Sequence, residues 1–234
     1  MKTTIVVNTF SPEDKGYAER QEYAMKELYR LRPHWAYVHE ARLLHDGSLD
    51  HATYTLNRDS AKVIGSTEHL PFVREIVQMA QHLHGISGVQ NDRDWFGFIN
   101  NDTIVTEAFF QRLEQIPLTK NMAVVRVWDI PDASGKFEPK RRGANADSND
   151  GILMRYPVYL EFMNTFPDMV LAAGWDTTFL YWARRFKIHP VVIDKGECLH
   201  VTHKRNWVQS KDKALTTMYN RQMLKLIYNY DWEW

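Results

Sequence analysis

The chain has 234 residues, 44% of them hydrophobic and 13% aromatic, which is enough for one well-packed core. Its 29 basic and 29 acidic residues give a formal net charge of zero, and this neutrality lowers the expectation of a partner bound through many phosphates. The single cysteine, Cys198, excludes an intramolecular disulfide and a zinc site built on cysteine pairs.

The N-terminal residues lack the long apolar stretch of a signal peptide, since only a short β-branched run precedes polar residues. No apolar run approaches the ~20 residues that span a bilayer. We therefore expect a cytoplasmic protein without a membrane span.

Strands and helices are predicted to alternate through the first half of the chain. The expected elements are, in order, a buried strand at residues 4–7, a helix from residue 11 to about residue 31, a strand at residues 35–41, a helix that starts at residues 70–72 and ends before Gly85, and an apolar strand at residues 95–99. β-branched residues indicate the first strand. Ser11 followed by Pro12 is typical of a helix start, and Pro33 is expected to stop that helix.

The second half continues the alternation after a polar turn at residues 100–102. The expected elements are a helix with Val105, Phe109 and Leu113 on one face, a strand at residues 122–128, a loop at residues 129–149, a strand at residues 151–156, helices at residues 157–165 and 176–185, a strand at residues 187–193 and a helix at residues 208–229. Proline, glycine and serine punctuate the loop. Its length predicts a functional loop or lid.

The alternation predicts a single domain over residues 1–234, with an α/β fold in which a mainly parallel central sheet carries helices on both faces. In open sheets of this kind, ligands bind beyond the carboxyl ends of the strands. The turn at residues 100–102 follows such an end, and we therefore expect it to border the binding site.

Oxygen and nitrogen ligands in three segments could converge on this turn. The segments contain Asn100, Asn101 and Asp102; Asp176; and His200 with His203, three residues apart. An aspartate suits a hard divalent ion and an imidazole suits manganese or zinc. Each segment also has a structural interpretation, because asparagine and aspartate are common in turns and a histidine can simply lie at a strand end.

Asp176 lies at a predicted helix N-terminus, where it could act as an N-cap or as a general base on an acceptor hydroxyl. Most of the eight tryptophans are expected in the core, since tryptophan usually packs there. Trp175 is the exception and is expected to contact a ligand, because it neighbours Asp176. Asp147 and Asp150 lie at the end of the loop. Asp150 is the stronger candidate for an acceptor contact, and Asp147 fits a solvated loop position.

In their order along the chain, these segments resemble the GT-A glycosyltransferases, especially the family-2-like bacterial and phage members. The resemblance covers most of the chain through short motifs. Residues 5–10 resemble the first strand and nucleobase-binding turn, and residues 98–102 resemble the strand leading into the Asp-x-Asp signature. Residues 151–155 resemble the strand after the acceptor loop. Residues 174–176, with Phe179 and Arg184, resemble the catalytic aspartate segment, and residues 200–203 resemble a His-x-x-His motif.

The resemblance implies a Rossmann-like GT-A fold and metal-dependent transfer of a sugar from a nucleotide-sugar donor to an acceptor hydroxyl. Residues 1–103 would form the nucleotide-sugar-binding half and residues 104–234 the acceptor-binding half. The resemblance implies that Asp102, with His200 or His203, binds Mn²⁺ or Mg²⁺. It implies donor binding by Asn8, Thr9, Phe10, Asn100, Asn101 and Asp102, and acceptor binding by Asp150 and Trp175. Asp176 would be the base of an inverting transfer.

Two positions depart from the family pattern. Asn100 stands where the first aspartate of Asp-x-Asp is usual, and it can hydrogen-bond a ribose but adds no charge. Trp175 stands where an acid usually precedes the catalytic aspartate.

Two other function classes stay open. A nucleotidyltransferase would need a basic, glycine-rich loop near the N-terminus, where residues 8–16 hold only Lys15 and Gly16. A non-catalytic nucleotide-sugar-binding module is the second alternative. The acceptor could be a glycan, a protein, a small molecule or modified DNA, the last suggested by two short basic segments that contain Lys140, Arg141, Arg142, Lys204, Arg205 and Trp207.

Overall fold

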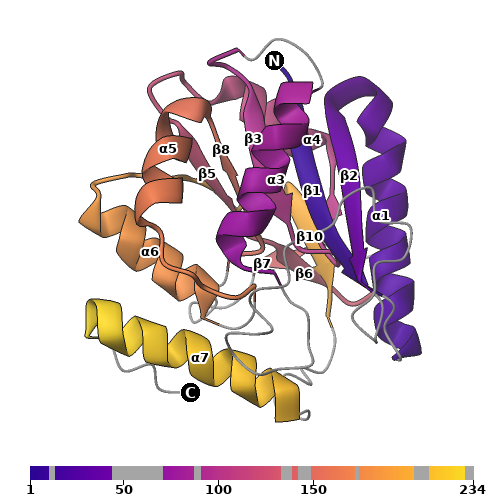
Figure 1. The fold of residues 1–234 in the computed structure, drawn as a ribbon. Coiled ribbons are helices and arrows are strands. Elements are labelled where there is room, and N and C mark those ends of the chain that lie inside the picture. The colour runs from indigo at the N-terminus through magenta and orange to yellow at the C-terminus, as the bar shows by residue number, and fades with distance from the viewer. Residues whose placement is uncertain are drawn as a thin grey trace.

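The computed structural model describes residues 1–10, 14–43, 71–86, 91–132, 139–141, 149–171, 174–202 and 211–229. In these residues the chain forms a mixed α/β fold with two sheets, and the larger sheet carries helices on both faces (Figure 1). None of the helices in this part of the chain combines the length and apolar character needed to cross a membrane.

The larger sheet has six strands in the order β2-β1-β3-β8-β5-β9. Its strands are β1 (Thr3–Phe10), β2 (Ala36–Leu43), β3 (Trp95–Ile99), β5 (Met122–Val125), β8 (Gly151–Met154) and β9 (Val191–Ile193). β1 pairs in parallel with β2 and β3, and β5 pairs in parallel with β9. β8 is antiparallel to both of its neighbours, β3 and β5. The prediction of a mainly parallel sheet is therefore confirmed, with β8 as the exception.

Helices cover both faces because both faces of these strands are apolar. Along β1, Ile5 and Val7 join one buried cluster and Val6 joins the other. The first cluster includes side chains of α1 (Lys15–Trp35) and α4 (Glu107–Gln115). The second includes side chains of α3 (Val73–Ile86), α5 (Tyr156–Thr165), α6 (Trp175–Arg185) and α7 (Lys211–Tyr228).

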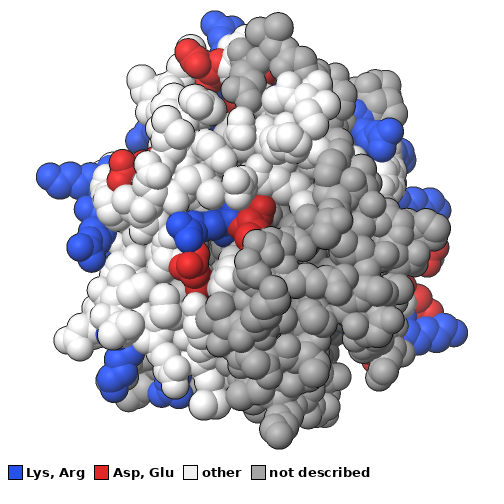
Figure 2. Space-filling model, viewed as in Figure 1, with Lys and Arg blue, Asp and Glu red and all other residues white. Residues whose placement is uncertain are grey.

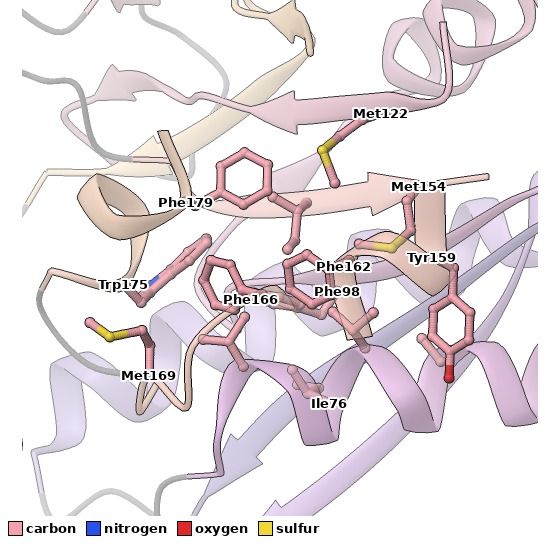
Figure 3. Packing of buried hydrophobic residues seen from close by; sticks show 14 of the residues in the cluster. Ile76, Phe98, Met122, Met154, Tyr159, Phe162, Phe166, Met169, Trp175 and Phe179 are labelled. Carbon is pink, nitrogen blue, oxygen red and sulfur yellow. The ribbon is translucent and has the colours of Figure 1, made fainter. Parts of the chain in front are cut away.

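The second cluster is rich in aromatic rings, which meet between β3 and helices α5 and α6 (Figure 3). Phe162 and Phe166 stack with ring centroids 4.5 Å apart, and Phe98 lies 5.3 Å from Trp175. Offset and tilted ring pairs of this kind add about 1 kcal/mol beyond the burial of their area. The packing thus attaches the first turn of α6 to the last residues of β3.

A second, four-stranded sheet has the order β4-β10-β6-β7. Its strands are β4 (Ile104–Val105), β10 (Cys198–Val201), β6 (Trp128–Ile130) and β7 (Lys140–Arg141). β10 is antiparallel to β4 and parallel to β6. Because β4 and β6 follow β3 and β5 along the chain, this sheet adjoins the carboxyl ends of the central strands, where the binding site is expected.

Several predicted boundaries are wrong. α1 begins at Lys15 and continues through Pro33 to Trp35, since a proline in the last turn removes only one late hydrogen bond. α3 likewise continues through Gly85 to Ile86. Val105 belongs to β4 and not to the helix that follows. Residues 122–128 contain β5 and the start of β6, and the expected loop at residues 129–149 contains the rest of β6 and all of β7.

Basic and acidic side chains are interspersed over the described part of the face shown in Figure 2, in keeping with the zero net charge of the chain.

Candidate functional site

The carboxyl ends of β3 and β5 are joined by the start of β8. The Asn100 amide donates to the Asp150 carbonyl at 2.7 Å, and the Asp150 amide donates to the Val125 carbonyl at 2.7 Å. Gly151 permits this approach, because a Cβ there would lie 2.6 Å from the Phe98 carbonyl oxygen. Asp150 is therefore held between the ends of two central strands.

Asp150 is only 6% exposed. Its carboxylate accepts a long hydrogen bond of 3.5 Å from the Asn100 side chain. Burial, followed by the nearby carboxylates of Glu197 and Asp150, raises the pKa of Cys198 well above its ordinary value. Asp150 thus lies close to β10 as well as to the turn after β3.

Asp102 and His200 meet beside these strand ends. Asp102 Oδ2 lies 3.3 Å from His200 Nε2, and the two side chains are 13% and 11% exposed. The small sheet produces this contact, because Leu199 pairs with Ile104 across β10 and β4. Asp102 precedes Ile104 by two residues and His200 follows Leu199, so two segments far apart in sequence converge.

A second aspartate contacts the same imidazole from the other side. Asp129 Oδ1 lies 3.1 Å from His200 Nδ1, and the two residues are directly paired in the register of β6 and β10. Asp129 is not among the residues predicted from the sequence. It follows the apolar run that begins at Met122, which predicts a single strand ending in a loop, so its position on a second strand is not evident from the pattern.

The Asp102–His200 pair fits a divalent cation by its chemistry. An ionised carboxylate only accepts hydrogen bonds, and a neutral imidazole has one N–H for its two nitrogens. His200 therefore cannot donate to both aspartates unless it is charged, and a cation between Asp102 Oδ2 and Nε2 removes this conflict. Two ligands of one octahedral ion with bonds of about 2.1 Å lie about 3 Å apart, close to the 3.3 Å observed.

Within the described ranges, no group of three or more histidine, cysteine, aspartate or glutamate side chains could hold a metal. Asp102 and His200 are thus the candidate pair of ligands within these ranges. His203, the alternative ligand, lies outside the described residues. So do Asp147, Arg142, Lys204, Arg205 and Trp207, and so do the side chains of Phe10 and Arg141.

The polar residues at the end of β1 are buried beside this site. Asn8 is 8% exposed and Thr9 is fully buried. Asn8 Oδ1 and Thr9 Oγ1 have no hydrogen-bond partner in the part of the chain that the structure describes. Val7 of β1 pairs with Ile99 of β3. The residues that follow them, Asn8 and Asn100, are therefore neighbours as well. The expected donor-binding residues of the two segments therefore adjoin one another.

The Asn101 side chain contacts α1. It accepts a hydrogen bond from the Tyr17 hydroxyl at 2.7 Å and donates one to Gln21 at 2.8 Å. Burial raises the pKa of Tyr17 far above its ordinary value, and the Asp102 charge raises it further. Tyr17 stays a neutral donor that holds Asn101, so these contacts assign Asn101 to the support of the turn.

Asp176 lies in the first turn of α6, where its carboxylate accepts a hydrogen bond from the Thr177 amide at 2.9 Å. The helix follows Gly174, whose positive φ of 93° is easily adopted by glycine. Trp175 is 6% exposed and packs within the aromatic core (Figure 3). A ring this buried offers little surface to an acceptor, so the structure gives Trp175 a packing role that places Asp176 near the end of β3.

Comparisons with known proteins leave the family open. No protein family model and no curated protein matches the sequence. Among solved structures, a similar one is the crystal structure of a glycosyltransferase involved in the glycosylation of the major capsid of PBCV-1. It has a TM-score of 0.40 and 10% sequence identity, with 95% of this chain and 100% of that chain covered. Similarity of this size assigns neither family nor function.

Proposed function

We propose that the chain is a metal-dependent glycosyltransferase that transfers a sugar from a nucleotide-sugar donor to an acceptor hydroxyl. The observation that carries the proposal is the contact of Asp102 with His200 at 3.3 Å beside the carboxyl ends of the central strands. This is the edge at which open α/β sheets bind their ligands. A carboxylate and an imidazole there suit a divalent cation paired with a diphosphate.

In this proposal the donor lies across the ends of β1 and β3. Asn8 and Thr9 bring buried polar atoms without a hydrogen-bond partner in the described structure, which suits hydrogen bonding to the nucleoside. Asn100, the half-buried residue that follows β3, suits hydrogen bonding to the ribose. Asp102 and His200 would hold Mn²⁺ or Mg²⁺, and the bound ion would offset negative charge on the departing nucleoside diphosphate.

Asp176 is the proposed general base. The acceptor oxygen attacks the anomeric carbon, the hydroxyl proton passes to the Asp176 carboxylate, and the bond between the anomeric carbon and the diphosphate oxygen breaks. Attack opposite the leaving group inverts the anomeric centre. The half-buried side chain of Asp176 and its location in the first turn of α6, beside the end of β3, support this role. Asp150 is proposed to contact the acceptor.

A panel of nucleotide sugars tests the proposal through thermal stability in the presence of Mn²⁺, because a ligand that binds only the folded state raises the melting temperature. We expect at least one donor to raise it only when the cation is present. Hydrolysis or transfer of that donor is then followed by release of the nucleoside diphosphate. If no nucleotide sugar shifts the melting temperature with any divalent cation, the proposal fails.

Two variants separate binding from chemistry. Asp102→Ala should abolish the cation-dependent shift, and Asp176→Asn should keep the shift but lower turnover by about a hundredfold or more, as for loss of a general base. Asp92→Asn is the matched control, since Asp92 is exposed in the turn that precedes β3, at the opposite end of that strand from Asp102. A donor that binds Asp176→Asn and wild type alike and is turned over by neither indicates a binding module.

A further inference from the structure

His200 is held between two aspartates that come from different strands. Its Nδ1 lies 3.1 Å from Asp129 Oδ1, and its Nε2 lies 3.3 Å from Asp102 Oδ2. The Asp129 side chain is 30% exposed and that of Asp102 13%. The two carboxylates therefore compete for the single N–H of a neutral imidazole.

Hydrogen bonds hold both neighbours of Asp129 on β6. On one side, the Trp128 indole N–H donates to the Asp194 carbonyl at 2.5 Å. On the other, the Ile130 carbonyl accepts hydrogen bonds from both the amide and the hydroxyl of Thr202. His200 and Asp129 are directly paired in the β6–β10 register, so the sheet places their side chains beside each other.

Asp102 has a different setting, because it lies in the turn between β3 and β4. Its contact with Nε2 is also the longer of the two. A proton on Nδ1 satisfies Asp129 and leaves the Nε2 lone pair facing Asp102, an arrangement of two electron-pair donors that suits a cation. A proton on Nε2 would occupy the lone pair with which this nitrogen binds a metal.

We infer that Asp129 is a positioning residue that holds the His200 proton on Nδ1 and thereby directs Nε2, together with the Asp102 carboxylate, toward a divalent cation. The inference rests on the proposed function for the identity of the site. Carboxylates hydrogen-bonded to metal-binding histidines commonly fix the tautomer and orientation of the ring, and their loss weakens metal binding about 10- to 100-fold.

The tautomer of His200 tests the inference directly in the metal-free protein. With ¹⁵N-labelled histidine, long-range proton–nitrogen correlation at a pH well above the usual histidine pKa distinguishes Nδ1–H from Nε2–H. His200→Gln identifies the resonance. Wild type should show the Nδ1–H tautomer, and Asp129→Ala should shift it to Nε2–H, because Asp102 still offers its carboxylate to Nε2. A wild-type Nε2–H tautomer overturns the inference without any variant.

The affinity for Mn²⁺, measured by the paramagnetic resonance of the free ion, provides the second readout. Asp129→Ala should weaken binding about 10- to 100-fold. Asp129→Asn should lose less, because its carbonyl oxygen can still accept from Nδ1–H, and Asp92→Asn should match wild type. Equal affinities for wild type and Asp129→Ala overturn the inference. Wild type that binds no Mn²⁺ instead contradicts the proposed metal site, while the tautomer still decides the role of Asp129.

Discussion

Arg155 links three parts of the fold through one buried side chain at the end of β8 opposite to Asp150. Its guanidinium donates to the carbonyls of Ile116, Pro117 and Lys120 and lies 4.2 Å from the centre of the Trp95 ring. The residue is 1% exposed. The side chain thereby joins the segment between α4 and β5 to β8, and the three hydrogen bonds and the Trp95 ring compensate for the burial of its charge.

Replacing Arg155 should destabilise the protein strongly. Arg155→Ala removes these three hydrogen bonds and leaves a cavity beside Trp95, and we expect it to lower the free energy of unfolding by about 3 kcal/mol. Urea denaturation measures the change. Arg221→Ala, at an exposed position of α7, should change it by less than about 0.5 kcal/mol. Equal midpoints for the two variants would show that Arg155 is not a structural residue.

His84 predicts a pH dependence of stability. It is 1% exposed, contacts Thr4 at 2.8 Å, and has a pKa lowered below its ordinary value of 6.5 by burial and by Lys2, against the opposing effect of Asp94. The unfolded chain therefore takes up the proton first as the pH falls below about 6.5, and stability is lost with it. Above that pH the contribution is fully present.

The non-titrating variant His84→Asn isolates this effect. Between pH about 7.5 and about 5.5, its free energy of unfolding should fall less than that of wild type. His82→Asn is the control, because His82 is exposed on the same helix. Parallel pH profiles for wild type and His84→Asn would contradict the assignment.

The sequence makes Asp102 and His200 candidate site residues, but it does not point to Asp129 or Arg155. The first two lie in recognisable segments, whereas the contact of Asp129 with His200 joins positions 71 residues apart. Arg155 looks like an ordinary charged residue at a strand end in the sequence. Its role depends on carbonyls that are left exposed by a turn nearly 40 residues earlier in the chain, which no local pattern reports.

At the scale of elements, the antiparallel pairing of β3 and β8 requires a glycine. A Cβ on Gly97 would lie 2.0 Å from the Ile152 carbonyl oxygen and 2.9 Å from the Leu153 Cα. Both neighbours are backbone atoms of a fully buried strand, so neither can move aside cheaply. This close approach aligns the carboxyl end of β3 with Asp150.

Gly97→Ala should therefore lower the free energy of unfolding by about 3 kcal/mol or more, since it overpacks the centre of the sheet. Gly16→Ala provides the contrast, because its Cβ would meet Arg20 and Asp14 only at an ordinary 3.4 Å. In the first turn of a helix, alanine should leave stability unchanged or raise it by up to about 1 kcal/mol. Chemical denaturation of both variants measures the difference, and a Gly97→Ala protein as stable as wild type would contradict the packing argument.

The strands that the sequence does not predict are all short. β4, β6 and β7 have only two or three residues each, and β10 has four, too few for a periodic pattern to be read. Such strands form only where a neighbour supplies hydrogen bonds. The β3 strand, in contrast, has the predicted bounds, because its apolar residues are all buried.

At the scale of the whole molecule, the two sheets have different roles. The six-stranded sheet provides the two cores and brings its strand ends to one edge. The four-stranded sheet joins segments from early and late in the chain at that edge, so that Asp102 from the predicted donor-binding half meets His200 from the predicted acceptor-binding half. We therefore expect donor binding to depend on both halves.

In the proposed function, Asp102 and His200 form a cation site for a nucleotide-sugar donor. Crystals grown with Mn²⁺ and the nucleoside diphosphate of the donor that gives the largest thermal shift test it most directly, through the anomalous scattering of manganese. We expect a manganese peak at about 2.2 Å from both Asp102 Oδ2 and His200 Nε2, with the diphosphate as a further ligand. Nucleoside diphosphate and manganese bound elsewhere, with Asp102 and His200 still in direct contact, would contradict it.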